Sequence, residues 1–278
     1  MTLETPLAPT PEPSPQPPRR GAAFAVSVVT IAVGACIALG TLAGTGASAV
    51  VSLRDTGENS SVLDSGVEGL TDVDIDVAAG ALTIAYGDVS EARLDADREG
   101  PRGWRFDRRG DTLRVSSPEG PFAGVGTGSR ATLTLPRELE GSGIRASIDV
   151  TGGSLDLDGD FGALSVQLAG GAATLRGSAA ELDVSVSGGA ATARVDDVST
   201  ASFEVAGGDL TAELGGLTPD RTKVDVTAGS ADITLPDDDY RVNVDDGLGR
   251  VDNALRTDAS ATARVDVQAT MGQVRLHS

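Results

Sequence analysis

The sequence is short of the residues on which much catalytic and cross-linking chemistry depends. Its 278 residues include one histidine, His277, and one cysteine, Cys36. We therefore expect no Ser-His-Asp or Cys-His catalytic site, no metal centre held by histidines and no disulfide framework. Aromatic residues make up only 3% of the chain. Any core must then be thin and built from Val, Leu, Ile and Ala.

Basic residues are also scarce, with 22 Lys and Arg against 41 Asp and Glu, so the net charge is −19. Nucleic acid is bound through Lys and Arg, and we therefore expect no nucleic-acid partner. The few charges of the first 53 residues cancel, so the whole net charge lies in residues 54–278. The length suggests one or two domains of ~100–200 residues each.

The N-terminal region has the features of a membrane anchor. Residues 1–20 hold seven of the 13 prolines and predict an extended, disordered tail. Residues 21–53 carry no charge, and their most apolar run, 22–43, matches the ~20 residues that cross a bilayer. Arg19 and Arg20 directly precede this run. The positive-inside rule therefore predicts a single-pass protein with a cytoplasmic N-terminus and its remaining chain outside.

A cleaved secretory signal is the alternative for the same region. Ala47-Ser48-Ala49 matches the small-residue cleavage pattern, and cleavage near Ala49 would release a secreted domain. The apolar run is longer than the ~7–15 residues of a signal peptide, which favours the uncleaved anchor. Gly-, Ser- and polar-rich residues at 54–69 predict a linker between the anchor and the domain.

From residue 148 onward, the sequence repeats a short strand, a glycine corner and a second short strand. The first clear unit is Ile148-Asp-Val150, Gly152-Gly153 and Leu155-Asp-Leu157. The second glycines of successive corners follow one another at steps of 18–23 residues: Gly153, Gly171, Gly189, Gly208, Gly229, Gly249 and Gly272. Alternation with a period of two predicts half-buried strands. A corner between such strands needs φ > 0 at one or more positions, which glycine allows.

Each unit is too small to bury its apolar side alone, so the units must stack. Stacking would align the inward residues of successive units in columns. The two columns are Val150, Leu168, Val186, Val205 and Val226, and Leu157, Leu175, Ala193, Ala212 and Ile233. We therefore predict an all-β, two-sheeted β-solenoid of undetermined handedness, with coils of ~18–23 residues, preceded by one transmembrane helix. A β-sandwich, whose strands also alternate, is the alternative.

The solenoid is expected to span residues 70–278. Strands at 73–77 and 82–84 form an earlier unit, and 97–130 is an irregular insertion whose Trp104 and Phe106 would cap the first coils. The last strand, 274–276, ends two residues before the end of the sequence, which leaves no room for a cap. Its open edge is expected either to be covered by an upstream loop or to mediate self-association with another chain.

Several segments, taken in their order, resemble the bacterial putative-adhesin family. They are Ala131-Thr-Leu-Thr-Leu-Pro136, the repeated glycine corners, Ile233-Thr-Leu-Pro236, and Tyr240-Arg-Val-Asn-Val244 followed by Gly247 and Gly249. The resemblance covers about residues 70–278 and implies a β-solenoid exposed on the bacterial surface. It implies no catalytic residues and no particular ligand.

Two acidic clusters are candidate calcium sites, because calcium prefers carboxylate oxygens. They are Asp156, Asp158 and Asp160, and Asp237, Asp238 and Asp239. The first cluster lacks the glycine and the final acid of an EF-hand loop, and solvated turns are the simpler explanation for both. Paired carboxylates also suit a carbohydrate-active enzyme, but the aromatic residues form no stripe that could hold a sugar. We therefore expect no enzymatic activity and no cofactor.

One concentration of basic residues, at 98–114, interrupts this acidic domain. Its candidate binding residues are Arg102, Trp104, Arg105, Arg108 and Arg109. They would bind anionic lipid or cell-wall phosphate, or else pair with the acidic faces of the solenoid. The sequence thus favours a non-enzymatic, membrane-anchored surface domain for adhesion or binding of a cell-envelope partner. The alternatives are an envelope sensor that signals through the helix and the Pro-rich tail, and a carbohydrate-active enzyme.

Overall fold

The computed structural model describes residues 60–97, 103–118 and 129–278. This part of the chain is all-β, as predicted, with one short 3-10 helix, η1 (Arg137–Leu139). The predicted tail, the transmembrane helix region 21–53 and the cleavage site near Ala49 lie outside the described residues. Within those residues, no helix is both long enough and apolar enough to cross a membrane.

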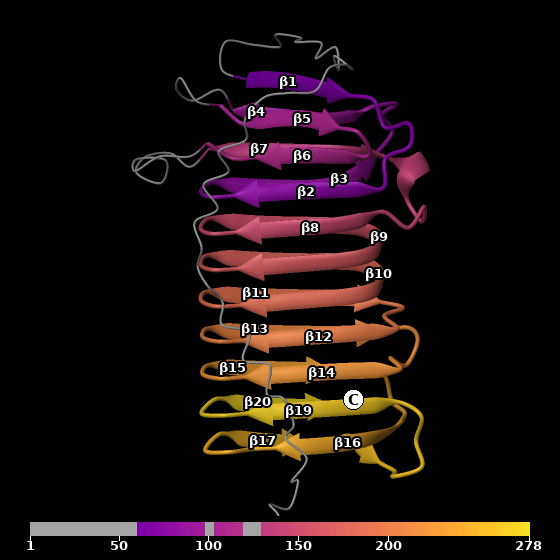
Figure 1. The fold of residues 1–278 in the computed structure, drawn as a ribbon, viewed down its shortest axis with the longest axis vertical. Coiled ribbons are helices and arrows are strands. Elements are labelled where there is room, and N and C mark those ends of the chain that lie inside the picture. The colour runs from indigo at the N-terminus through magenta and orange to yellow at the C-terminus, as the bar shows by residue number, and fades with distance from the viewer. Residues whose placement is uncertain (1–59, 98–102, 119–128) are drawn as a thin grey trace, which may run out of the picture. The chain divides into compact units, whose positions relative to one another are not determined.

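The strands pair in two ladders, which we call the first and the second face (Figure 1). In spatial order, the first face contains β5 (Arg105–Arg109), β6 (Thr112–Ser116), β2 (Asp72–Val77), β8 (Arg145–Val150), the second halves of β9 (Ser154–Leu168) and β10 (Ala172–Val186), β12 (Thr200–Val205), β14 (Arg221–Val226), β19 (Arg264–Ala269) and β16 (Asp239–Asp245). The second face contains β1 (Ser60–Ser65), β4 (Ala92–Asp97), β7 (Arg130–Pro136), β3 (Ala81–Gly87), the first halves of β9 and β10, β11 (Ala190–Asp196), β13 (Asp209–Gly215), β15 (Ser230–Thr234), β20 (Gln273–His277) and β17 (Arg250–Asn253). The short β18 (Arg256–Thr257) pairs with the start of β16.

Neighbouring strands are parallel, except where β5, β4 and β1 pair antiparallel at the N-terminal end. The register places Val150 beside Leu168 and continues through the rest of the predicted column. The column that contains Leu157 and Ile233 is formed in the same way. Every member of both columns is buried, so both predictions are confirmed. This parallel pairing differs from the antiparallel sheets of the β-sandwich that was the alternative.

The corner glycines allow successive repeats to approach closely. At Gly171, φ is +97°, and a Cβ there would overlap the carbonyl oxygen of Gly153. That oxygen accepts a hydrogen bond from the amide of Ala172 at 3.0 Å, and the same contact recurs along the stack. The last two corners differ. The left-handed residue near Gly249 is Gly247, with φ of +39°, and Gly272 is needed for space beside the Val226 side chain.

The spatial order departs from chain order at both ends of the stack. The repeat formed by β2 and β3 lies between β6/β7 and β8/β9, and the repeat formed by β19 and β20 lies between β14/β15 and β16/β17. Repeats that are neighbours in the sequence are therefore not neighbours in space at either end. At the C-terminal end, β19 and β20 contribute five fully inward apolar residues, whereas β16 and β17 leave Val242, Val244 and Val251 partly exposed. The more apolar repeat gains more by being covered on both sides.

Of the two outcomes expected for 274–276, the structure shows cover by an upstream segment, because β20 pairs with β15 on one side and with the upstream strand β17 on the other. Two further expectations are corrected. Strand β1 lies within the stretch 54–69 that was expected to be a linker. Strand β6, within the expected insertion 97–130, pairs with β2 as part of the stack. Trp104 and Phe106 are buried in this first part of the core, as expected of capping residues.

Candidate functional site

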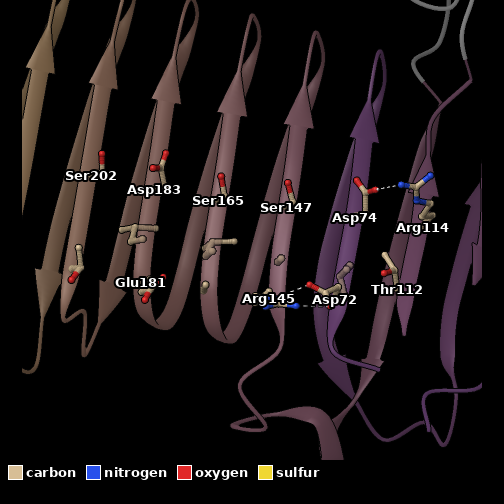
Figure 2. Close-up of a pocket in the computed structure, with 16 residues that line it drawn as sticks. Asp72, Asp74, Thr112, Arg114, Arg145, Ser147, Ser165, Glu181, Asp183 and Ser202 are labelled. Atoms are coloured by element: carbon tan, nitrogen blue, oxygen red, sulfur yellow. Dashed lines mark hydrogen bonds and ion pairs between the residues drawn. The ribbon is translucent and has the colours of Figure 1, made fainter. Parts of the chain in front are cut away.

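The first face carries an open pocket of about 630 Å³ that crosses six neighbouring strands, from β6 to β12 (Figure 2). We call it the face pocket. Its polar lining residues are Asp72, Asp74, Thr112, Arg114, Arg145, Ser147, Ser165, Glu181, Asp183, Thr200 and Ser202. The parallel register places one outward residue of each strand in a single row, which runs Arg114, Asp74, Ser147, Ser165, Asp183 and Ser202. Neighbouring members of the row are about 4.8 Å apart, the spacing of paired strands.

Ion pairs neutralise the N-terminal part of the face pocket. Arg145 donates from Nε to Asp72 Oδ1 at 2.8 Å and from Nη2 to Asp72 Oδ2 at 2.9 Å. This hydrogen-bonded guanidinium holds the pKa of Asp72 below its usual value. Arg114 Nη2 lies 3.0 Å from Asp74 Oδ2. The charged groups of both pairs face solvent, so water and salt screen their attraction.

The other part of the face pocket has carboxylates without such partners. Among the described residues, neither Glu181 nor Asp183 forms an ion pair within 4 Å. Partial burial raises the pKa of Asp183, and the positive charge of Lys223 lowers it by a smaller amount. Asp183 lies in register with Ser165 and Ser202 on the neighbouring strands, and Glu181 lies in register with Thr200. The arrangement offers a line of hydrogen-bond acceptors and hydroxyls to a ligand that extends across the strands.

The predicted basic patch separates into structural and exposed members. Trp104 is buried, and its Nε1 donates to Ser129 Oγ at 2.7 Å. Arg108 donates to the carbonyl oxygens of Gly66, Glu68 and Gly110. Its guanidinium therefore joins the hairpin β5–β6 to the segment that follows β1.

Two other members of the patch, Arg105 and Arg109, are exposed. Arg109 pairs with Asp107 at 3.1 Å. Arg102 lies outside the described residues. Of the five predicted binding residues, two therefore serve the packing of the hairpin β5–β6 and two remain open to a partner.

The two candidate calcium clusters make other contacts. Asp156 pairs with Arg176 at 2.8 Å, and Asp160 Oδ1 accepts from the backbone and hydroxyl of Ser178. Asp158 is exposed beside them.

In the second cluster, Arg256 lies 3.2 Å from Asp237 and 3.5 Å from Asp239. The pKa of Asp238 is lowered by the backbone amide of Asp239 and by the Thr218 hydroxyl, which donates at 2.8 Å. In the described part of the chain, no three His, Cys, Asp or Glu residues are grouped as metal ligands.

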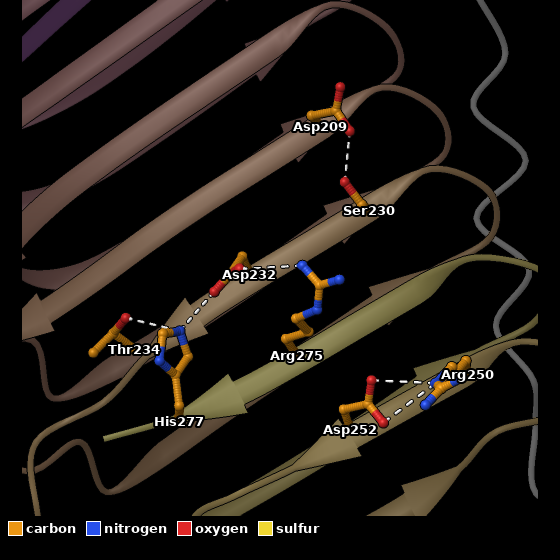
Figure 3. Close-up of polar contacts among 8 residues, drawn as sticks. All are labelled: Asp209, Ser230, Asp232, Thr234, Arg250, Asp252, Arg275 and His277. Atoms are coloured by element: carbon orange, nitrogen blue, oxygen red, sulfur yellow. Dashed lines mark hydrogen bonds and ion pairs between the residues drawn. The ribbon is translucent and has the colours of Figure 1, made fainter.

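The single histidine lies in a polar cluster on the second face, at its C-terminal end (Figure 3). His277 Nε2 lies 2.6 Å from Asp232 Oδ1 and 3.2 Å from Thr234 Oγ1, and Arg275 approaches the same carboxylate at 3.8 Å. A nucleophile–base–acid relay needs one ring nitrogen for the hydroxyl and the other for the carboxylate. Here one nitrogen faces both groups, so the cluster is not arranged as a relay.

The row of the face pocket is the feature that sequence reasoning missed. Its members occupy the middle outward position of each first strand, as in Ala146-Ser147-Ile148 and Leu164-Ser165-Val166. Aligning the repeats would have placed these residues side by side. The pocket also needs the pair Asp74 and Arg114, and their strands are brought together only by the altered order at the N-terminal end.

The described geometry can be compared with known proteins. No protein-family model matches the sequence, and no curated protein is similar enough to count as a relative. Solved structures with a similar chain course include a putative cell adhesion protein from Clostridium sporogenes (13% identity, 79% of this chain and 99% of that one, TM-score 0.35). Two others are putative adhesins, from Bacteroides fragilis (13%, 79% and 98%, TM-score 0.34) and from Parabacteroides merdae (13%, 78% and 95%, TM-score 0.40). At such TM-scores, the likeness carries no argument about function.

Proposed function

We propose that the protein is a β-solenoid surface domain, anchored by the apolar segment 21–53, with a non-enzymatic role in adhesion or in binding a partner of the cell envelope. The chain outside the anchor would face the exterior, as the charges of Arg19 and Arg20 favour. The proposal for the solenoid is supported by the parallel, in-register pairing of successive repeats.

The face pocket is the observation that carries the proposed role. Its row of Ser147, Ser165, Asp183 and Ser202 runs across the strands, so it presents hydroxyls and a carboxylate at a regular interval. Such a row suits an extended ligand with repeated hydroxyl or amino groups, which is the chemistry of cell-wall polymers. A compact substrate would touch only a small part of it.

The same lining supports a binding role over catalysis. Glycoside hydrolysis needs a proton-donating acid and usually an aromatic surface for the sugar. The pKa of Asp183 is raised, as a general acid requires, but none of the described residues that line the face pocket is aromatic. We therefore assign the pocket to recognition, and a lack of hydrolytic turnover on cell-wall polymers is the expected result.

The proposal is tested by the binding of the full-length protein to whole bacterial cells and to cell-wall fractions, with and without calcium. We expect saturable binding to a wall fraction that calcium does not alter, because the acidic clusters already have protein partners. Binding that requires calcium would move the site to those clusters. Absence of binding to every fraction would contradict the proposal and favour an envelope sensor that acts through the helix and residues 1–20.

A further inference from the structure

The C-terminal end of the stack leaves part of one strand unpaired. Strand β16 pairs with β19 on one side, and Arg241 donates its amide to Ala263 on that side at 2.8 Å. On the opposite side, β18 and the amide of Asp258 reach β16 only as far as Tyr240. No other described strand pairs with β16, so its outer edge is free beyond Tyr240.

The direction of each backbone group on that edge follows from the strand geometry. The N–H and C=O groups of one residue point to the same side, and successive residues alternate. Arg241 faces β19, so Asn243 and Asp245 face it as well. Val242 and Val244 therefore direct their N–H and C=O groups outward, where they have no strand partner among the described residues.

The same two valines leave apolar surface exposed at this end of the core. Val242 and Val244 continue the inward columns that contain the buried residues Val265 and Val267. Val244 is 41% exposed, and Leu248 at the adjoining corner is 87% exposed. An exposed edge with unpaired backbone groups and apolar side chains is a template for another strand.

We propose that a second copy of this chain docks on this edge, with β16 antiparallel to β16 of the other copy and Asn243 on the two-fold axis. In this register, Val242 of one copy lies opposite Val244 of the other. Both residues point their backbone groups at the partner, so each such pair exchanges two hydrogen bonds. The two apolar ends cover each other, as expected for an isologous interface.

Charge selects this register over its neighbours. With Asn243 on the axis, Arg241 of each copy lies opposite Asp245 of the other, which is a favourable cross-strand pair. A register centred on Val242 would place Asp239 opposite Asp245 and would bring the second strand onto the position of β18. A register centred on Val244 would place Asn243 opposite Asp245 and leave Arg241 without an acidic partner.

Disulfide trapping in the full-length chain tests the axis directly. Asn243→Cys is made in a Cys36→Ser background, so that the new thiol is the only one. Residues that face each other on the axis have Cβ atoms about 4.5–5.5 Å apart, close enough to cross-link after small adjustment. We expect a covalent dimer on mild oxidation. Asp245→Cys in the same background is the matched control, and it should give no covalent dimer because residue 245 lies opposite Arg241 of the other copy. No dimer from Asn243→Cys, or equal yields from both variants, would overturn the proposal.

Charge exchange tests the register independently of cross-linking. Arg241→Asp and Asp245→Arg each place like charges opposite one another and should weaken the dimer about tenfold or more in sedimentation experiments. The double variant Arg241→Asp/Asp245→Arg restores opposite charges and should recover most of the affinity. A double variant that associates no better than the single variants would contradict this register. Both tests are independent of any ligand in the face pocket.

Discussion

Gly171 lies where two stacked corners approach most closely, between the carbonyl oxygen of Gly153 and the next corner at Gly189. Gly171→Ala would add a Cβ that overlaps backbone and would hold an L-residue at a φ of +97°. We expect a loss of about 2–3 kcal/mol in the free energy of unfolding, measured by urea denaturation. Gly66→Ala is the control, because a Cβ there meets no atom within 4 Å. Equal stability of the two variants would show that the corners are not tightly stacked.

Thr222 is fully buried in β14, and its hydroxyl has no hydrogen-bond partner among the described residues. The register places it between Ala201 and Val265 in an otherwise apolar column. Thr222→Val keeps the shape of the side chain and removes the unsatisfied hydroxyl. We therefore expect the free energy of unfolding to rise by about 1 kcal/mol. Thr222→Ser keeps the hydroxyl and loses a methyl group, and it should be less stable than the wild type. Thermal or urea unfolding of the two variants gives the comparison, and a destabilised valine variant would contradict this description of the column.

At the scale of elements, Arg108 joins the hairpin β5–β6 to the turn after β1 through carbonyl oxygens of Gly66 and Glu68. Arg108→Ala should lower the free energy of unfolding by about 1–2 kcal/mol, since hydrogen bonds from a charged group are lost. Arg105→Ala removes an exposed arginine from the same hairpin and should change stability by less than about 0.5 kcal/mol. Comparing the two unfolding curves tests whether Arg108 stabilises the fold while Arg105 does not. Equal curves would mean that Arg108 is as free to bind a partner as Arg105.

The strands themselves could be predicted from alternation, because inward residues such as Val150 and Leu168 must be apolar wherever repeats stack. The order of the repeats could not be predicted in the same way. The alternation in β19 resembles that in β16, so either repeat would fit beside β14 by pattern alone. The choice depends on how much apolar surface each repeat buries. The role of Arg108 could not be predicted because two of its three carbonyl partners lie about 40 residues earlier in the chain.

At the scale of the whole molecule, the candidate site is a product of the register rather than of any local motif. Ser147, Ser165 and Asp183 are unremarkable in their own segments, and only stacking turns them into a row. The sequence could therefore predict the fold class and the inward columns, whereas the face pocket required the spatial order of the repeats. The predicted anchor belongs to a part of the chain outside the described strands.

The most direct test of this account compares wall binding by two full-length variants that carry the same new side chain. Ser165→Tyr fills the middle of the face pocket, and Thr192→Tyr adds an equal side chain at an outward, half-buried position of β11 on the second face. Both positions are in strands, where tyrosine is well tolerated. We predict that Ser165→Tyr lowers the affinity for the wall fraction at least tenfold and that Thr192→Tyr binds as the wild type does. Unchanged binding by Ser165→Tyr would contradict the assignment of the face pocket as the recognition site.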